Sequence, residues 1–207
     1  MNNLELRLVV LDLETTNNPE RNNKHEIIEV AAMEILGNEI NSDSPFHTLV
    51  RPPCRIQAHN FKVSGISDEA VKFAPTIDRV LPDLLGFIGD NAILGHNLKF
   101  DARVLSEHLN DFEIRGIPNV FLDTLVLSRK LNKKGGSHTL DAVMEKLGID
   151  FSGGRRHRAL KDVECTALVF LKFVEILKEY NITTIEMIDR LCNTDAIVED
   201  FLQLELF

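Results

Sequence analysis

The chain has 207 residues, 44% of them hydrophobic, which suits one generous domain, or one domain with a tail, and leaves no apolar stretch long enough to cross a bilayer. The N-terminus lacks the features of a signal peptide, and three widely spaced cysteines indicate free thiols in a reducing cytoplasm. The net charge of −9 excludes attachment to nucleic acid by electrostatics alone, unless cations in a site or a partner hold the protein there.

The first part of the chain is rich in strand patterns. Three segments predict strands: residues 6–14, 26–35 and 46–52. The first is apolar on both faces, as in the middle of a covered sheet, and Gly37 with Asn38 predicts a tight turn after the second. Residues 51–67 predict an irregular segment. Residues 76–89 predict a helix, in which Pro82 would cause a kink or a break.

In the rest of the chain, strand and helix patterns alternate. Two segments predict strands, residues 92–97 and 119–123, and five predict helices, residues 100–109, 123–131, 137–148, 159–180 and 183–192. The helix over residues 159–180 is the longest and carries an apolar stripe at helical spacing. Three strands followed by alternating strands and helices predict an α/β fold in which helices pack on a mixed sheet.

Two carboxylates interrupt the apolar pattern of the first strand. Asp12 and Glu14 share one face with Leu8 and Val10, because side chains alternate along a strand. Two anions this close repel each other, and one would hold a proton unless something neutralises them. The alternative is a solvated strand end that begins a turn, which the polar residues that follow also fit.

Asp101 is another carboxylate on an apolar face, in the helix predicted over residues 100–109. It lies one turn before Val104 and Leu105 and therefore shares their apolar face. An aspartate at the start of a helix is also favoured by the helix dipole, which accounts for its position. The dipole does not account for a carboxylate that points toward the core.

A third polar group lies at the start of the long helix, where His157 precedes Asp162 by five residues. On a continuous helix this offset separates two side chains by about 140°, so they converge only if His157 lies on the preceding loop. Gly153 and Gly154 are compatible with such a loop. The alternative is a surface histidine within a basic cluster.

Taken together, these residues predict a metal-dependent site. Asp12, Glu14, Asp101 and Asp162 would offer oxygen ligands to hard divalent cations. Two such cations form a clamp for in-line attack on a phosphodiester, in which one activates water and the other stabilises the leaving oxygen. His157 would then suit the role of general base for that water. The cations would also offset the acidic charge of the protein.

Three segments carry a resemblance to a known family. LDLETT, GHNLKFDARVL and HRALKD resemble, in order, the three motifs of the DEDDh group of 3′–5′ exonucleases. The resemblance implies a ribonuclease-H-like α/β fold with a five-stranded mixed sheet. It also implies two Mg²⁺ or Mn²⁺ ions held by Asp12, Glu14, Asp101 and Asp162, with His157 as the general base. The expected reaction releases nucleoside 5′-monophosphates from the 3′ end of DNA.

The same resemblance implies the substrate contacts. Thr15 would lie near the 3′-terminal nucleotide, Phe61 and Ile66 would flank the terminal base, and Asn97 with Phe100 would shape the site. The chain departs from the family at two positions, which are Asn17 in place of a frequent glycine and Ser64 in place of a frequent histidine. Neither is a ligand position, so we expect activity.

Within the group, proofreading subunits of bacterial DNA polymerase III are the expected relatives. This organisation divides the chain into an exonuclease domain, residues 1–180, and a helical spacer with a tail, residues 181–207. The tail ends in QLELF, which resembles the short peptide that binds the ring-shaped bacterial sliding clamp. Gln203 would supply hydrogen bonds, while Leu204, Leu206 and Phe207 would fill apolar pockets. The alternative is that these apolar side chains close over the protein's own core.

Two other functions compete with a DNA exonuclease docked on the clamp, alone or with a polymerase subunit. An RNA-directed member of the same group would use the same catalytic residues, because the choice depends on the 2′-hydroxyl and the local pocket. A catalytically silent module could recruit the clamp or a polymerase. The complete set of four carboxylates and His157 argues against a silent module.

Overall fold

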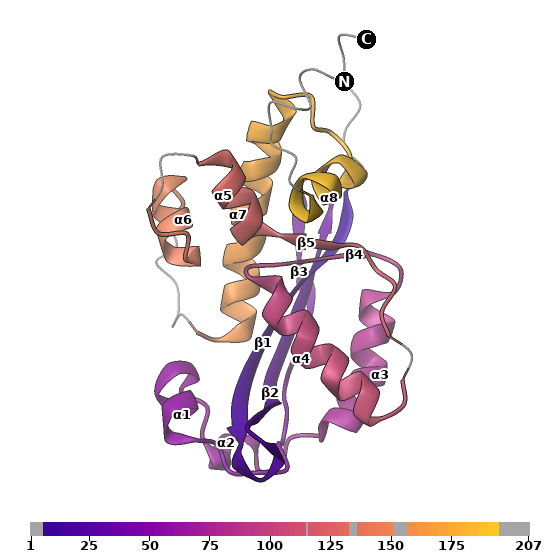
Figure 1. The fold of residues 1–207 in the computed structure, drawn as a ribbon, viewed down its shortest axis with the longest axis vertical. Coiled ribbons are helices and arrows are strands. Elements are labelled where there is room, and N and C mark those ends of the chain that lie inside the picture. Colours follow the sequence, from indigo (N-terminus) through magenta and orange to yellow (C-terminus); the bar gives the residue numbers. More distant parts are fainter. Residues whose placement is uncertain (1–5, 115, 133–135, 151–156, 195–207) are drawn as a thin grey trace.

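The computed structural model describes residues 6–114, 116–132, 136–150 and 157–194. Their strands form a five-stranded sheet in the order β3-β2-β1-β4-β5 (Figure 1). The strands are β1 (Arg7–Asn18), β2 (Lys24–Leu36), β3 (Glu39–Leu49), β4 (Ala92–Gly95) and β5 (Phe121–Asp123). The pairs β1–β2 and β2–β3 are antiparallel, whereas β1–β4 and β4–β5 are parallel. The predicted five-stranded mixed sheet is confirmed.

Helices cover both faces of this sheet (Figure 1). The described helices are η1 (Pro19–Arg21), α1 (Ala58–Ser64), α2 (Asp68–Val71), α3 (Ile77–Ile88), α4 (Leu98–Asp111), α5 (Thr124–Leu131), α6 (Leu140–Lys146), α7 (Ala159–Lys178) and α8 (Ile185–Asn193). Of these, α5, α6, α7 and α8 contribute to one large hydrophobic core, and α3 and α4 contribute to the other large core. A smaller third cluster includes Val71 of α2. None of the described helices is long and apolar enough to cross a membrane.

The central strand β1 supplies both cores, because its side chains alternate between the two faces of the sheet. Leu8 and Val10 belong to the core under α7, whereas Val9 and Leu11 belong to the core under α3 and α4. All four are at most 2% exposed, as expected for a strand covered on both faces. The alternation therefore directs the next even-numbered side chains of β1 toward the α7 layer.

Several boundaries differ from the sequence-based prediction. β1 continues to Asn18 through a bulge between Glu14 and Thr15, so the acidic pair is inside a strand rather than at a solvated strand end. The segment over residues 51–67, expected to be irregular, contains α1, which ends at Gly65 in the left-handed conformation. The turn at Gly37 is confirmed, and this glycine has a φ of +65°.

Pro82 does not break the predicted helix, because α3 continues from Ile77 through Pro82 to Ile88. A proline inside a helix removes one backbone hydrogen bond and crowds the preceding turn. The apolar face of α3 offsets this cost, since Leu81 and Leu84, on either side of the proline, are both fully buried. Tertiary packing thus overrides the local signal for a break.

The outer strand β5 is covered by α8. Ile188 and Leu191 of this helix are buried in the core under α7, and Asn193 Nδ2 donates to the carbonyl oxygen of Phe121 on β5 at 3.1 Å. This helix lies in the region predicted as a spacer. The predicted tail Gln203–Phe207 lies outside the described residues.

Candidate active site

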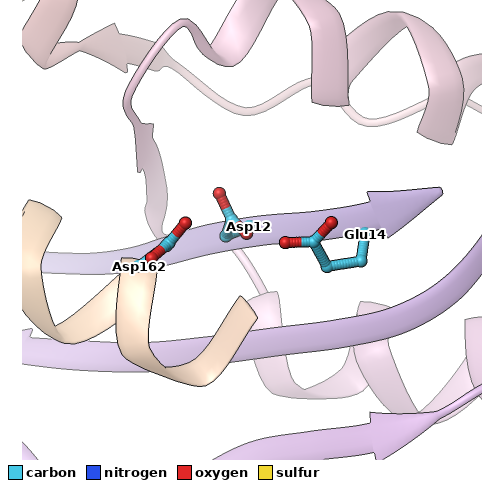
Figure 2. Close-up of side chains that lie close together, drawn as sticks. All are labelled: Asp12, Glu14 and Asp162. Carbon is cyan, nitrogen blue, oxygen red and sulfur yellow. The ribbon is translucent and has the colours of Figure 1, made fainter. Parts of the chain in front are cut away.

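Three carboxylates converge at the middle of the sheet. Asp12 and Glu14 project from β1, and Asp162 projects from the first turn of α7 (Figure 2). One oxygen from each carboxylate can be chosen so that all three lie within 4.8 Å of one another. The pairing follows from the fold, because the face of β1 that carries the even-numbered residues packs against α7. Two of the predicted sequence motifs therefore meet in space.

Asp101 reaches the same region from the other helical layer. It is 6% exposed, and its Oδ1 accepts a hydrogen bond from the N–H of Leu13 at 3.1 Å. The parallel pairing of β1 with β4 ends at Val10, so Leu13 has no strand partner on that side and takes a side chain instead. The predicted inward-pointing carboxylate is thus present and is fixed to the amide of the residue between Asp12 and Glu14, but it is not one of the three carboxylates that lie within 4.8 Å of one another.

The electrostatics of this cluster favour cations. Burial, and then the charges of Asp162, Glu29 and Asp101, raise the pKa of Glu14 to about 7, although Arg158 acts in the opposite direction. Burial also raises the pKa of Asp101 to about 7, against the hydrogen bond from Leu13. Ionising these groups without added positive charge is therefore unfavourable. A set of crowded carboxylate oxygens is the donor set that Mg²⁺ and Mn²⁺ prefer, so the residues fit the two predicted cations.

His157 lies on the loop before α7, as its offset from Asp162 required. Its φ of +63° is left-handed, its side chain is exposed, and it lines a cleft of about 890 Å³ together with Asp12, Asp162 and Asn97. The imidazole of His157 is thus open to solvent in the same cleft as Asp12 and Asp162. The geometry therefore brings together a proton acceptor and the predicted metal ligands.

The opening of the cleft depends on a tight turn between β4 and α4. A Cβ on Gly95 would lie 2.7 Å from Leu98 Cδ1 and 3.3 Å from the carbonyl oxygen of Leu11, so a larger residue there would force Leu98 and the backbone at Leu11 to shift. Asn97 has a left-handed φ of +65°, which asparagine tolerates well, and its N–H donates to Asp123 Oδ1 at 2.9 Å. This turn places Asn97 at the cleft, where substrate binding was predicted.

The other predicted substrate residues lie around the bulge of β1. Thr15 Oγ1 is 3.3 Å from His25 Nδ1. Phe61 on α1 is 48% exposed, whereas Ile66 is 1% exposed and packs against Ile28. Phe61 is thus available for stacking on a base, whereas Ile66 is part of a hydrophobic cluster and is not exposed to a ligand. Their roles toward substrate stay predictions.

Sequence reasoning missed two groups of residues near the cleft. Glu29 is fully buried on β2 and forms an ion pair with Arg158; the signal was a glutamate inside an apolar run. His96 lines the cleft and links Thr124 Oγ1, at 2.9 Å from Nδ1, to the carbonyl oxygen of His138, at 3.0 Å from Nε2. No sequence pattern pointed to that link, because its partners are far apart along the chain.

Comparison with known proteins identifies the family. The sequence profile of the exonuclease family RNase_T matches residues 9–170. The chain belongs to this exonuclease family. It is 38% identical over 187 residues to a PolC-type DNA polymerase III of Thermotoga maritima, covering 90% of this chain but 13% of that protein. It is 35% identical over 176 residues to the DNA polymerase III epsilon subunit of Aquifex aeolicus, covering 85% of this chain and 84% of that one.

Solved structures agree on the fold. Exonuclease X, in complex with a 5′-overhanging duplex DNA, has a TM-score of 0.71 and 23% identity, with 90% of this chain and 99% of that chain covered. The nuclease domain of 3′hExo, a DEDDh family member bound to rAMP, has a TM-score of 0.71 and 19% identity, with 85% and 95% covered. The predicted ribonuclease-H-like fold and the resemblance to DEDDh exonucleases and epsilon subunits are thus confirmed. The chain spans 13% of the length of the PolC-type relative.

Proposed function

We propose that the protein is a metal-dependent 3′–5′ exonuclease that hydrolyses DNA from its 3′ end to nucleoside 5′-monophosphates. The observation that carries this proposal is the convergence of Asp12, Glu14 and Asp162 within 4.8 Å, beside a cleft that Asp12, Asp162 and His157 line. Phosphodiester hydrolysis needs both a site for cations and an acceptor for the proton of the attacking water. The cleft offers residues suited to both tasks.

Asp12, Glu14, Asp162 and Asp101 are the residues that would hold the two cations. When bound, the cations would activate water for attack and stabilise negative charge on the phosphate and on the leaving 3′ oxygen. His157 accepts the proton of the attacking water at a ring nitrogen. The P–O3′ bond to the remaining strand breaks, and the terminal nucleotide leaves with its 5′ phosphate. Asn97 and Phe61 hold the terminal nucleotide by a polar contact and by stacking on the base.

Similarity to polymerase-associated proteins favours DNA as the substrate. The first relatives are DNA polymerase III proteins, and exonuclease X was solved with DNA. We infer a role in proofreading or repair beside a polymerase subunit, with Gln203–Phe207 docking on the sliding clamp. Docking would give an acidic enzyme a high effective concentration at the DNA, which its charge of −9 does not provide.

An RNA-directed exonuclease is the second candidate. It is favoured by one observation, which is that 3′hExo, of similar fold, was solved with the ribonucleotide rAMP. The carboxylates do not discriminate, because both substrates present the same phosphodiester to the metals. The two candidates differ only in the sugar that the cleft accepts.

Product ladders from 5′-labelled DNA and RNA oligonucleotides of one sequence test both candidates. We expect DNA to shorten from its 3′ end with Mg²⁺ or Mn²⁺ and to stay intact with a chelator. The variant Asp12→Asn should be inactive, whereas Asp43→Asn, at an exposed position of β3, should match the wild type. Shortening of RNA alone would replace the DNA assignment, and a chelator-resistant ladder would refute metal dependence.

Metal titration by calorimetry distinguishes an enzyme from a silent recruiting module. We expect Mn²⁺ to bind the wild type and to bind Asp12→Asn far more weakly, because a carboxylate ligand is lost. A wild type that binds no divalent cation would support the silent module.

A further inference from the structure

An ion pair between the buried Glu29 and the partly exposed Arg158, the residue that follows His157, lies next to the carboxylate cluster. Glu29 on β2 is directly opposite Glu14 in the β1–β2 pairing, and its side chain is 0% exposed. Arg158 Nε lies 3.1 Å from each carboxylate oxygen of Glu29, and Arg158 Nη2 lies 2.6 Å from Oε1. Such a forked contact fixes the orientation of the guanidinium as well as its distance.

Glu29 also holds the backbone at the start of α7. Its Oε2 accepts a hydrogen bond from the N–H of Ala159 at 3.0 Å, and Ala159 is the first residue of the helix. Arg158 occupies the N-cap position and makes no capping hydrogen bond with its own side chain. A carboxylate from β2 therefore performs the capping role and places a negative charge at the positive end of the helix dipole.

His47 completes the surroundings of Glu29, with its Nε2 at 2.8 Å from Oε1. The carboxylate thus contacts three groups on two different elements, β3 and the start of α7. A fully buried carboxylate with this many contacts does not move without losing several charge-assisted hydrogen bonds. The start of α7 is therefore attached to the rigid centre of the sheet.

The attachment matters because of what lies on either side of it. His157 precedes Arg158 and has a left-handed φ of +63°, a conformation that is uncommon for a residue with a Cβ. Asp162 follows Ala159 within the first turn of α7. His157 and Asp162 line the same cleft. The contacts of Glu29 with Arg158 and Ala159 thus lie, along the chain, between the proposed base His157 and the proposed metal ligand Asp162.

We propose that Glu29 and Arg158 are positioning residues for His157, because their ion pair fixes the end of its loop relative to Asp12 and Asp162. The inference rests on the proposed exonuclease function, in which His157 is the general base. Neither residue needs to touch the substrate. A displacement of about 1 Å in a catalytic group is enough to lower a rate on the order of 100-fold.

A double-mutant cycle on Arg158 and His157 tests the inference. Arg158→Ala should lower kcat about 10- to 100-fold with little change in KM, and Arg158→Lys, which keeps the charge but loses the fork, should restore part of the loss. In a His157→Ala background, Arg158→Ala should change kcat by less than about 3-fold, because its effect passes through His157. Equal losses of kcat in both backgrounds would overturn the inference.

A matched control and two further measurements separate positioning from other roles. Lys172→Ala removes an ion pair of the same helix, 2.9 Å from Glu175, and should leave kcat unchanged. Arg158→Ala should keep the Mn²⁺ affinity measured by calorimetry, and it should speed hydrogen exchange at the first amides of α7. A rise in KM alone would assign Arg158 to substrate binding instead, and lost Mn²⁺ binding would assign it to the metal site.

The outcome also distinguishes this inference from the proposed function. A wild type that degrades DNA or RNA, combined with additive losses in the cycle, refutes positioning by Arg158 and leaves the exonuclease intact. A wild type that degrades neither refutes the proposed function, and with it the role of His157 as the base that Arg158 positions.

Discussion

Replacing Glu14 by Gln in the metal-free protein should raise the free energy of unfolding at neutral and alkaline pH. The pKa of Glu14 is raised from 4.5 to about 7 by burial and by neighbouring carboxylates. One pKa unit corresponds to about 1.4 kcal/mol, so keeping this carboxylate ionised in the fold costs roughly 3 kcal/mol. Because the folded pKa lies above the unfolded one, the stabilisation is complete below about pH 4.5 and is lost as the pH rises through about 7.

Gln resembles the protonated carboxyl at every pH, so the advantage of Glu14→Gln should grow from near zero at pH 4.5 to roughly 3 kcal/mol at pH 8. For a chain of this size that equals a rise of about 6–12 °C in melting temperature. Thermal unfolding followed by far-ultraviolet circular dichroism, with chelator and at both pH values, measures this difference. Glu145→Gln, on the exposed side of α6, is the matched control.

Two results would refute this reasoning. One is an equal melting temperature for the wild type and Glu14→Gln at pH 8 with chelator. The other is a gain in melting temperature that does not depend on pH, since burial of charge predicts a gain only where the wild type is ionised. Adding Mn²⁺ should raise the melting temperature of the wild type more than that of the variant, because binding to the folded state stabilises it.

Three further outcomes are expected. His157→Ala should lower kcat by about 10²–10⁴-fold and leave Mn²⁺ affinity by calorimetry unchanged, since only the proton acceptor is lost; weakened Mn²⁺ binding would contradict that role. Asp101→Asn still offers an oxygen to the Leu13 N–H, so thermal unfolding should show an intact fold while activity falls by about 10²-fold or more; full activity would remove Asp101 from the ligands. Deleting Gln203–Phe207 should preserve cleavage of short oligonucleotides and abolish binding to a bacterial sliding clamp, and unchanged clamp affinity in titration calorimetry would exclude docking.

The sequence predicted the parts of the site that follow from local periodicity. Alternation along β1 places Asp12 and Glu14 on one face. The helical offset of five residues allowed His157 and Asp162 to converge only with His157 before α7, where it is found. The sheet and its α/β layering followed from the order of the patterns. These features depend on neighbours in sequence, which is why they could be inferred.

Features that depend on distant contacts could not be predicted in the same way. Asp101 was expected to point inward, but its contact with Leu13 was not expected. That contact exists because β4 pairs with β1 only as far as Val10. The point at which strand pairing ends cannot be inferred from a local sequence pattern. Glu29 fell within the strand predicted over residues 26–35 and received no role, because its partner Arg158 is 129 residues away. Pro82 locally favours a break in the helix, but burial of the apolar face of α3 outweighs that preference and the helix continues through it.

The position of α8 has a consequence for the outer edge of the sheet. Among the described strands, β5 has a neighbour in the sheet on one side only, and an unpaired strand edge is a template for pairing with another molecule. Asn193 occupies one carbonyl of that edge, at Phe121, while Ile188 and Leu191 fix the helix over it. A chain shortened to residues 1–180 would lose this cover, and would self-associate through β5 even with every carboxylate of the cleft in place.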